Sequence, residues 1–245
     1  LSILSDPDAA ALPSPMESGR LPALVSGLSA VHRAHLAAAL RVKYSRPLVI
    51  LCPDENTASA IAGDVSALTG ETCTLLSGRD YALYSADAMS RGGEQRRINA
   101  LAAMMNGGGI TVATAEGLFQ RTMPPEVFRR AAFEIDMSAS LAPEDVEDAL
   151  LRCGYSRAEQ VEGPGQFSRR GGILDFFSPA YTQPVRMEFW GDEIDSMGFF
   201  DTVTQRRTES IERCAVVPAA EVLPTLAKGG ATALSAELNR QADRA

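Results

Sequence analysis

The stretch GQFSRRGGILDFFSPAYTQPVRMEFWGDEIDSMGFFDTVTQRR, residues 165–207, decides how this chain folds. Within it, residues 185–190 (VRMEFW) alternate apolar side chains with polar or aromatic ones, the period of two that indicates a strand with one buried face. Gly191 follows, and a glycine at the first position of a two-residue loop suits a type II′ hairpin because it tolerates a positive φ. Residues 194–200 supply the returning strand and residues 173–177 a further one. We therefore expect a small sheet built around this hairpin.

Arg186 and Trp190 are predicted to lie on the same face of their strand, away from its apolar side chains. A tryptophan on that face has two explanations. Either it covers a neighbouring strand or a second domain, or it belongs to a protein-binding surface, because Trp and Arg are enriched at binding hot spots. Arg170 comes just before the apolar run of an adjacent strand. The three side chains can therefore form one cationic and aromatic patch.

Residues 1–124 alternate short apolar runs with segments of helical spacing. A continuous apolar run such as LVILC, residues 48–52, is typical of a buried parallel strand. The expected strands are residues 23–26, 48–52, 72–76 and 110–114, and the expected helices are residues 30–40, 56–68 and 94–105. Strands that alternate with helices of this length predict a parallel α/β sheet.

Residues 125–212 are predicted to form a smaller α+β domain. It opens with a short strand at residues 133–135, and a helix then runs from Pro143 to about Gly154, because proline and acidic residues suit a first turn. The strand-rich stretch quoted above completes it. The remaining residues, 213–245, begin with the apolar run CAVVP and end in a polar helix, and they are too short to form a domain by themselves.

The composition excludes several classes of protein. A formal net charge of −8 disfavours a dedicated duplex-DNA binder, since phosphate recognition needs a basic footprint. No apolar run reaches the length of a membrane span, and the first residues do not resemble a signal peptide. The four scattered cysteines favour reduced thiols in a cytoplasmic protein. His32 and His35 lack a third ligand nearby, so we expect no metal site.

The segments RGGILDFF (170–177), PVRMEFWGDEIDS (184–196) and FDTVTQR (200–206) resemble the second domain of the UvrB family of nucleotide-excision-repair proteins. Within that family they are most similar to the amino-terminal module of the transcription-repair coupling factors. The resemblance implies a degenerate helicase-like, P-loop-type α/β domain of parallel strands, into which a smaller α+β domain is inserted. Residues 213–245 would then return to the first domain. We expect the run that contains Val216 and Val217 to lie as a strand on or beside its parallel sheet.

The phosphate-binding loop of a UvrB-type helicase, G-x-x-x-x-G-K-[S/T], is missing from the corresponding place in this chain. Residues 25–33 read VSGLSAVHR, so only Gly27 remains and no lysine is near. The loop needs glycines to wrap its N–H groups around the phosphates and a lysine to reach the terminal ones. We therefore expect no nucleotide cofactor. The motif DEID, residues 192–195, resembles a helicase metal-binding box. It lies in a predicted hairpin turn after Trp190 and Gly191, however, and its acids are expected to cap the turn and keep a sheet edge soluble.

The resemblance implies an adaptor without enzymatic activity that recruits UvrA, with Arg170, Arg186 and Trp190 as the contact residues. The aromatic position is commonly phenylalanine in the family. The family also uses this module to restrain a motor further along the parent chain, which would continue beyond Ala245 and contact RNA polymerase and DNA. The alternative is a fragment of an active UvrB-like helicase that grips damaged DNA. That alternative needs the phosphate loop and an aromatic hairpin, for which Tyr81 and Tyr84 are the only candidates.

Overall fold

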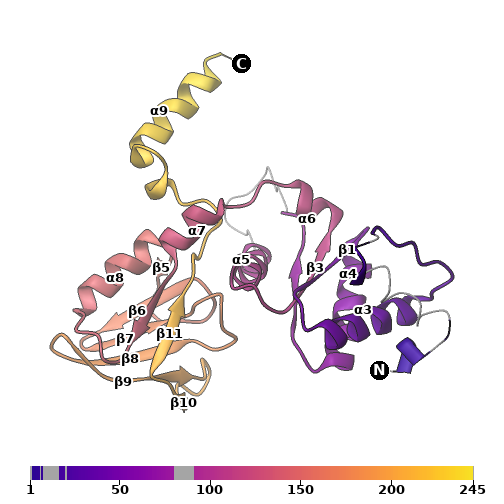
Figure 1. Cartoon of the computed structure of the whole chain (residues 1–245). Helices are drawn as coiled ribbons and strands as arrows, with labels where there is room; N and C mark the ends of the chain where they lie inside the picture. Colours follow the sequence, from indigo (N-terminus) through magenta and orange to yellow (C-terminus); the bar gives the residue numbers. More distant parts are fainter. Residues whose placement is uncertain (1, 6, 8–16, 20, 80–90, 245) are drawn as a thin grey trace. The chain divides into compact units, whose positions relative to one another are not determined.

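The computed structural model describes residues 2–5, 7, 17–19, 21–79 and 91–244 (Figure 1). The chain divides into two compact units. Unit 1 consists of Leu1–Tyr81 with Ala100–Gln120, and unit 2 consists of Ala82–Asn99 with Arg121–Ala245. The boundary falls inside helix α5 (Arg91–Met105). None of the described helices is long and apolar enough to cross a membrane.

Unit 1 is an α/β unit with a parallel sheet. Among the described residues its three strands lie in the order β1-β3-β2, and both pairings are parallel. The strands are β1 (Leu48–Cys52), β2 (Cys73–Leu76) and β3 (Ile110–Thr114), and the helices are α3 (Ala30–Tyr44), α4 (Glu55–Thr69) and the short α6 (Ala115–Phe119). These elements confirm the strands and helices predicted from residues 30–114.

Helices α3 and α4 pack against one face of this sheet (Figure 1). The buried cluster there joins Ala38 of α3 and Ile61 of α4 to Val112 of β3. Asp54 caps the amino-terminal end of α4, because its carboxylate accepts a hydrogen bond from the Thr57 N–H at 2.8 Å. That hydrogen bond holds the pKa of Asp54 below its ordinary value. The sequence pattern thus places the helix, which begins one residue before the predicted Asn56.

The strand predicted at residues 23–26 is absent. These residues carry no regular secondary structure, and Leu24 is 95% exposed. The prediction was wrong because a short apolar run becomes a strand only if a neighbouring strand supplies the hydrogen bonds that its backbone loses on leaving water.

Unit 2 is built on a mostly antiparallel sheet. Among the described residues its order is β10-β9-β8-β7-β6-β5, and only β5 and β6 pair in parallel. The strands are β5 (Ser156–Arg157), β6 (Gln166–Arg170), β7 (Ile173–Phe176), β8 (Val185–Trp190), β9 (Glu193–Phe200) and β10 (Arg207–Ser210). The hairpin between β8 and β9 turns at Gly191, whose φ of 63° is the positive value that the sequence predicted.

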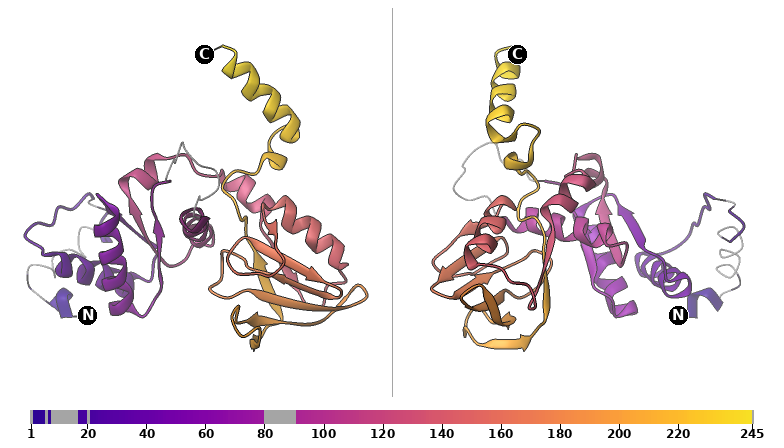
Figure 2. Two further views of the ribbon diagram at one scale, coloured as in Figure 1. Left: turned by 180° about the vertical axis from the view of Figure 1, so that it is seen from behind. Right: turned by 60° about the vertical axis from the view of Figure 1, so that its left-hand side comes forward.

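Helix α8 (Pro143–Arg152) is tied to this sheet by ion pairs. Arg169 of β6 pairs with Glu144 and, at 3.6 Å, with Glu147. The buried apolar face of α8 carries Val146 and Leu150. Unit 2 also contains the helices α7 (Pro125–Ala131) and α9 (Gly230–Ala242) and the 3₁₀ turn η3 (Pro224–Leu226) (Figure 2).

The segment after residue 212 does not join the sheet of unit 1. Strand β11 (Arg213–Val216) pairs antiparallel with β4 (Phe133–Asp136), so that Val216 lies opposite Phe133 and Cys214 opposite Ile135. The segment is therefore not a strand of the parallel sheet. An apolar run specifies that a segment is buried, but it does not specify which strand provides its hydrogen bonds. The β4–β11 pair brings together the two ends of the strand-rich part of unit 2.

The first half of α5 is fastened to the segment after β11 by a buried polar cluster. Arg97 Nε lies 3.1 Å from Glu221 Oε1, and both side chains are only 1% exposed. The Glu221 N–H donates to Glu94 Oε1 at 2.7 Å, and Gln95 Nε2 donates to the Ala219 carbonyl at 2.9 Å. Because ions buried in this way are stable only when paired, the cluster fixes which residues of α5 face this segment.

Replacing Glu221 with alanine is expected to lower the free energy of unfolding of unit 2 by about 3 kcal/mol, because the buried Arg97 guanidinium loses its ion pair with the Glu221 carboxylate. Urea titration with hydrogen-exchange readout on unit 2 amides measures the change. Glu237→Ala removes the partner of the exposed Arg240 and is the matched control, with an expected loss of about 0.5 kcal/mol or less. Equal losses in the two variants would contradict a special role for the buried pair.

Candidate functional site

The sheet of unit 2 brings Arg170 and Arg186 to the same buried carboxylate. Asp175 of β7 is 2% exposed and lies directly opposite Arg186 of β8. Arg186 Nε is 2.7 Å from Asp175 Oδ1, and its Nη2 is 2.8 Å from Oδ2. Arg170 Nη2, on β6, lies 3.9 Å from the same Oδ2. The two arginines that the sequence singled out are therefore neighbours around one negative charge.

Arg186 donates most of its hydrogen bonds to other groups of unit 2. Besides the two bonds to Asp175, it donates from Nη1 to the Gln205 carbonyl at 3.1 Å and from Nη2 to Gln205 Oε1 at 2.9 Å. Its guanidinium also stacks 4.4 Å from the ring centre of Phe200. The hydrogen bonds to Asp175 raise the pKa of Arg186 above its ordinary value. Four of its five N–H donor positions are occupied, and its side chain is only 18% exposed.

The loop between β9 and β10 is held by this arginine. Gln205 adopts a φ of 60°, a left-handed conformation that is uncommon for residues other than glycine. Asp201 Oδ1 accepts the N–H groups of Thr204 at 2.7 Å and Val203 at 3.2 Å. Val203 itself is 88% exposed at the middle of the loop. The loop is thus a rigid turn, and Arg186 is the side chain that positions it.

Trp190 lies at the far end of β8 and is 83% exposed. Such exposure rules out the explanation that it covers a neighbouring strand. It shares a strand face with Arg186 and Glu188, but four residues at roughly 3.3 Å each place its Cα about 13 Å from that of Arg186. Glu188 lies between them and pairs with Arg207 at 3.1 Å. The three predicted residues therefore lie on one face of the sheet and do not meet at one point.

Arg170 lies two strands away from β8, level with Glu188. It is opposite Ile173, which is opposite Glu188 in the next strand. The Arg170 side chain is 58% exposed and Ile173 is 39% exposed. We call the exposed face formed by Arg170, Ile173, Trp190 and the adjoining Val203 loop the arginine-tryptophan face. It offers a partner the exposed guanidinium of Arg170 and several apolar contacts.

Sequence reasoning missed Asp175, Gln205 and Val203. The signal for Asp175 was present, because an acid within the apolar run ILDFF has to be paired if it is buried. No comparable signal exists for Gln205, whose backbone conformation depends on a partner from another strand. Tyr81 and Tyr84, considered for an aromatic hairpin, lie outside the described residues.

The place expected for a nucleotide in unit 1 has acidic rather than basic surroundings. Ligands of parallel α/β sheets bind at the carboxyl ends of the strands. There, a cavity of about 410 Å³ is lined by the carboxylates of Asp54, Glu55 and Glu116, together with Arg79. Residues 25–33 contain the amino-terminal end of α3, where Ser29 is the cap and accepts the His32 N–H. Within the described residues, no group of three or more side chains could hold a metal ion.

Residues 133–221 match the family model of the UvrB interaction domain. This span begins with β4 and includes every strand of unit 2 through β11. The span also contains Arg170, Arg186 and Trp190.

Three curated relatives match about four-fifths of the chain, and each is a transcription-repair-coupling factor. The protein of Myxococcus xanthus is 33% identical over 208 residues, which cover 81% of this chain and 17% of the relative. The protein of Bacillus subtilis is 27% identical over 202 residues, which cover 82% of this chain and 17% of the relative. The protein of Escherichia coli is 26% identical over 199 residues, which cover 81% of this chain and 17% of the relative. The matched part is about a sixth of the length of these relatives.

Replacing Arg186 with alanine is expected to lower the free energy of unfolding by about 2 kcal/mol, because Asp175 loses its closest counter-charge inside the sheet. Arg170→Ala is the matched control and should change it by about 0.5 kcal/mol or less, since that side chain is exposed. Denaturant titrations of both variants measure the difference. The double variant Arg186→Leu/Asp175→Asn should recover part of the loss, and a double variant no more stable than Arg186→Ala would contradict this explanation.

Proposed function

We propose that this chain, which belongs to the transcription-repair-coupling factor family, is a docking module that binds UvrA in transcription-coupled nucleotide excision repair. The arginine-tryptophan face is the surface that we assign to this contact. The observation that carries the proposal is the 83% exposure of Trp190 on the strand face that also holds Arg186, within a match to the UvrB interaction domain. A large aromatic residue exposed beside arginines is the composition of a binding hot spot.

Each residue of the face contributes differently in this proposal. Trp190 is the apolar anchor, because its ring can be buried in a pocket of the partner at a low entropy cost. Arg170 pairs with a carboxylate of the partner, since most of its guanidinium is in solvent. Arg186 offers one remaining N–H and keeps the Val203 loop in place. The complementary surface on UvrA is therefore an apolar pocket beside acidic residues.

We infer that unit 1 is a degenerate helicase-like domain without nucleotide chemistry of its own. Two observations support this inference. Residues 25–33 lack the lysine and the second glycine of a phosphate-binding loop, and the cavity at the carboxyl ends of the strands is lined by three carboxylates that would repel phosphates. Any ATPase motor of the parent protein, and its contacts with RNA polymerase and DNA, would then lie in the rest of the longer chain.

We also propose a revised boundary for the docking domain. The sequence suggested residues 125–212 as an inserted domain, with 1–124 before it and 213–245 returning to the first domain. Because β11 pairs with β4, residues 213–221 are better assigned to the docking domain. The cluster around Glu221 supports the same boundary, since it holds this segment against the first half of α5.

Trp190→Ala and Arg170→Ala are each expected to weaken UvrA binding at least tenfold, since truncating a central hot-spot residue typically costs about 2 kcal/mol. Surface plasmon resonance with purified UvrA of the same organism measures the affinity. Phe119→Ala and Arg213→Ala are the matched controls, because Phe119 is 91% exposed in unit 1 and the Arg213 side chain is 64% exposed outside the face.

Arg186→Ala should also lose at least tenfold in affinity, but through the loop that it positions as well as its own contact. Arg186→Lys keeps the positive charge but lacks the planar guanidinium that binds Asp175 and Gln205, so it should restore little of the lost affinity for UvrA. Affinities are compared at equal folded fractions. If folded Trp190→Ala and Arg170→Ala bound UvrA as tightly as the unaltered chain, the docking site would be wrong.

The chain is expected neither to bind nor to hydrolyse ATP measurably, because residues 25–33 cannot form the phosphate cradle. Isothermal titration calorimetry with Mg·ATP tests the binding, and phosphate release tests the hydrolysis. Restoring the lysine with Arg33→Lys serves as a comparison and should remain inactive, since His32 still occupies the position of the second glycine. Micromolar affinity in the unaltered chain would contradict the inference for unit 1.

A further inference from the structure

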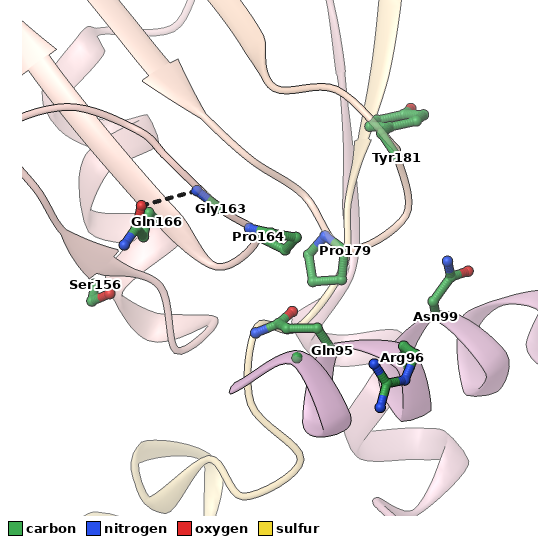
Figure 3. Close-up of a pocket in the computed structure, with 10 residues that line it drawn as sticks. Gln95, Arg96, Asn99, Ser156, Gly163, Pro164, Gln166, Pro179 and Tyr181 are labelled. Carbon is green, nitrogen blue, oxygen red and sulfur yellow. Dashed lines mark hydrogen bonds between the residues drawn. The ribbon is translucent and has the colours of Figure 1, made fainter. Parts of the chain in front are cut away.

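A cavity of about 650 Å³ lies within unit 2, between the first half of α5 and the region where β6 begins. Its volume falls in the range of small-ligand and peptide sites, roughly 300–1,000 Å³. Figure 3 shows α5 on one side of it, with Pro164, Gln166 and Pro179 on the other. Gln166 begins β6 whereas Arg170 ends that strand, so the cavity is separate from the arginine-tryptophan face.

One polar stripe of α5 lines the cavity. Gln95, Arg96 and Asn99 follow Gly92 at the spacing i+3, i+4 and i+7, which places all four on one side of a helix. The apolar Ile98 of the same helix is 1% exposed, so the helix has a buried apolar side as well. A polar stripe that lines a cavity is chemistry for which the docking function gives no explanation.

Gln95 directs an unsatisfied acceptor into the cavity. The residue is 6% exposed, and its Nε2 donates to the Ala219 carbonyl, which fixes the orientation of the amide. Its Oε1 is buried and receives no hydrogen bond from the described residues. Figure 3 shows this oxygen turned towards Pro164 and Pro179, and neither proline has an N–H to donate. A buried acceptor of this kind needs a donor from beyond the described residues.

The neighbouring polar groups favour a ligand that carries one negative charge. Arg96 is exposed and forms no ion pair with any described residue. It lies in the second turn of α5. Gln166 accepts the N–H groups of Glu162 and Gly163 with its Oε1, which leaves its Nε2 as a donor towards a ligand carbonyl.

We propose that this cavity binds an extended peptide segment that carries an aspartate or glutamate side chain. A backbone N–H of the peptide donates to Gln95 Oε1, and a backbone carbonyl accepts from Gln166 Nε2 or the Asn99 amide. The acidic side chain pairs with Arg96, whose planar fork matches one carboxylate. Arg96 can neutralise the one charge of a carboxylate but only half of the charge of a phosphate group. The rest of the chain, with its net charge of −8, would repel the second phosphate charge. The site goes beyond the proposed docking function and uses none of its residues.

The test is a titration of the ¹⁵N-labelled chain with acetyl-Gly-Asp-Gly-methylamide, followed by NMR. Saturable shifts are expected for the Gln95 side-chain amide and for the backbone amides of residues 163–166. The otherwise identical asparagine peptide should bind about tenfold more weakly, because it lacks the charge that Arg96 recognises. Arg96→Gln should weaken binding of the aspartate peptide by a similar factor. Arg121→Gln, an exposed arginine outside the cavity, is the matched control and should leave binding unchanged.

Several results would overturn the proposal. A cavity that holds water only would show no saturable shift with either peptide. Equal affinity for the aspartate and asparagine peptides, or equal binding by Arg96→Gln, would remove the carboxylate site. Inorganic phosphate or AMP that shifts the same amides more strongly than the aspartate peptide would assign the cavity to a phosphate ligand instead. UvrA binding is measured on the same variants, and Arg96→Gln should leave it unaltered, so a failure here is distinguishable from a failure of the docking site.

Discussion

The burial of Asp175 constrains the whole arginine-tryptophan face. A carboxylate that is 2% exposed in a sheet is stable only if cations surround it, and this chain supplies Arg186 from one neighbouring strand and Arg170 from the other. The same guanidinium of Arg186 then reaches Gln205 and fixes the loop that follows β9. One buried charge thus determines the spacing of the arginines, the conformation of the loop and the rigidity of the surface that they form.

A second buried polar cluster has a comparable role at the other end of unit 2. Arg97, Glu221 and their neighbours join a helix to a segment more than a hundred positions later in the sequence. Apolar packing alone would tolerate small rotations of α5, because hydrophobic contacts are not directional. Paired charges and oriented amides do not tolerate them. The polar stripe of α5 consequently faces its cavity in one defined orientation.

The sequence predicted the local structure well where periodicity decides it. The strand at residues 185–190, the face that Arg186 shares with Trp190, and the helix that begins after Asp54 all follow from alternation or from a cap. The prediction failed where a distant partner decides the outcome. Residues 23–26 found no strand to pair with, and β11 paired with β4 instead of the parallel sheet.

In the candidate site, too, local features could be predicted from the sequence, whereas contacts with distant partners could not. Its exposed residues could be named from the sequence, because residue type and strand parity are local properties. The hydrogen bonds of Arg186 to Asp175 and Gln205 could not be predicted from the sequence. They depend on the register of β7 against β8 and on the path of the loop between β9 and β10. An arginine expected at a surface therefore has a structural role as well.

The exposure of Trp190 has a spectroscopic consequence. It is the only tryptophan of the chain, so the indole fluorescence of the whole protein originates at the arginine-tryptophan face. An indole in water emits at long wavelength and shifts to shorter wavelength when a partner covers it. Because Trp190 is already in solvent, unfolding would change its emission wavelength little, whereas occupation of the face would change it strongly. The chain thus carries an intrinsic optical reporter that responds to association rather than to denaturation.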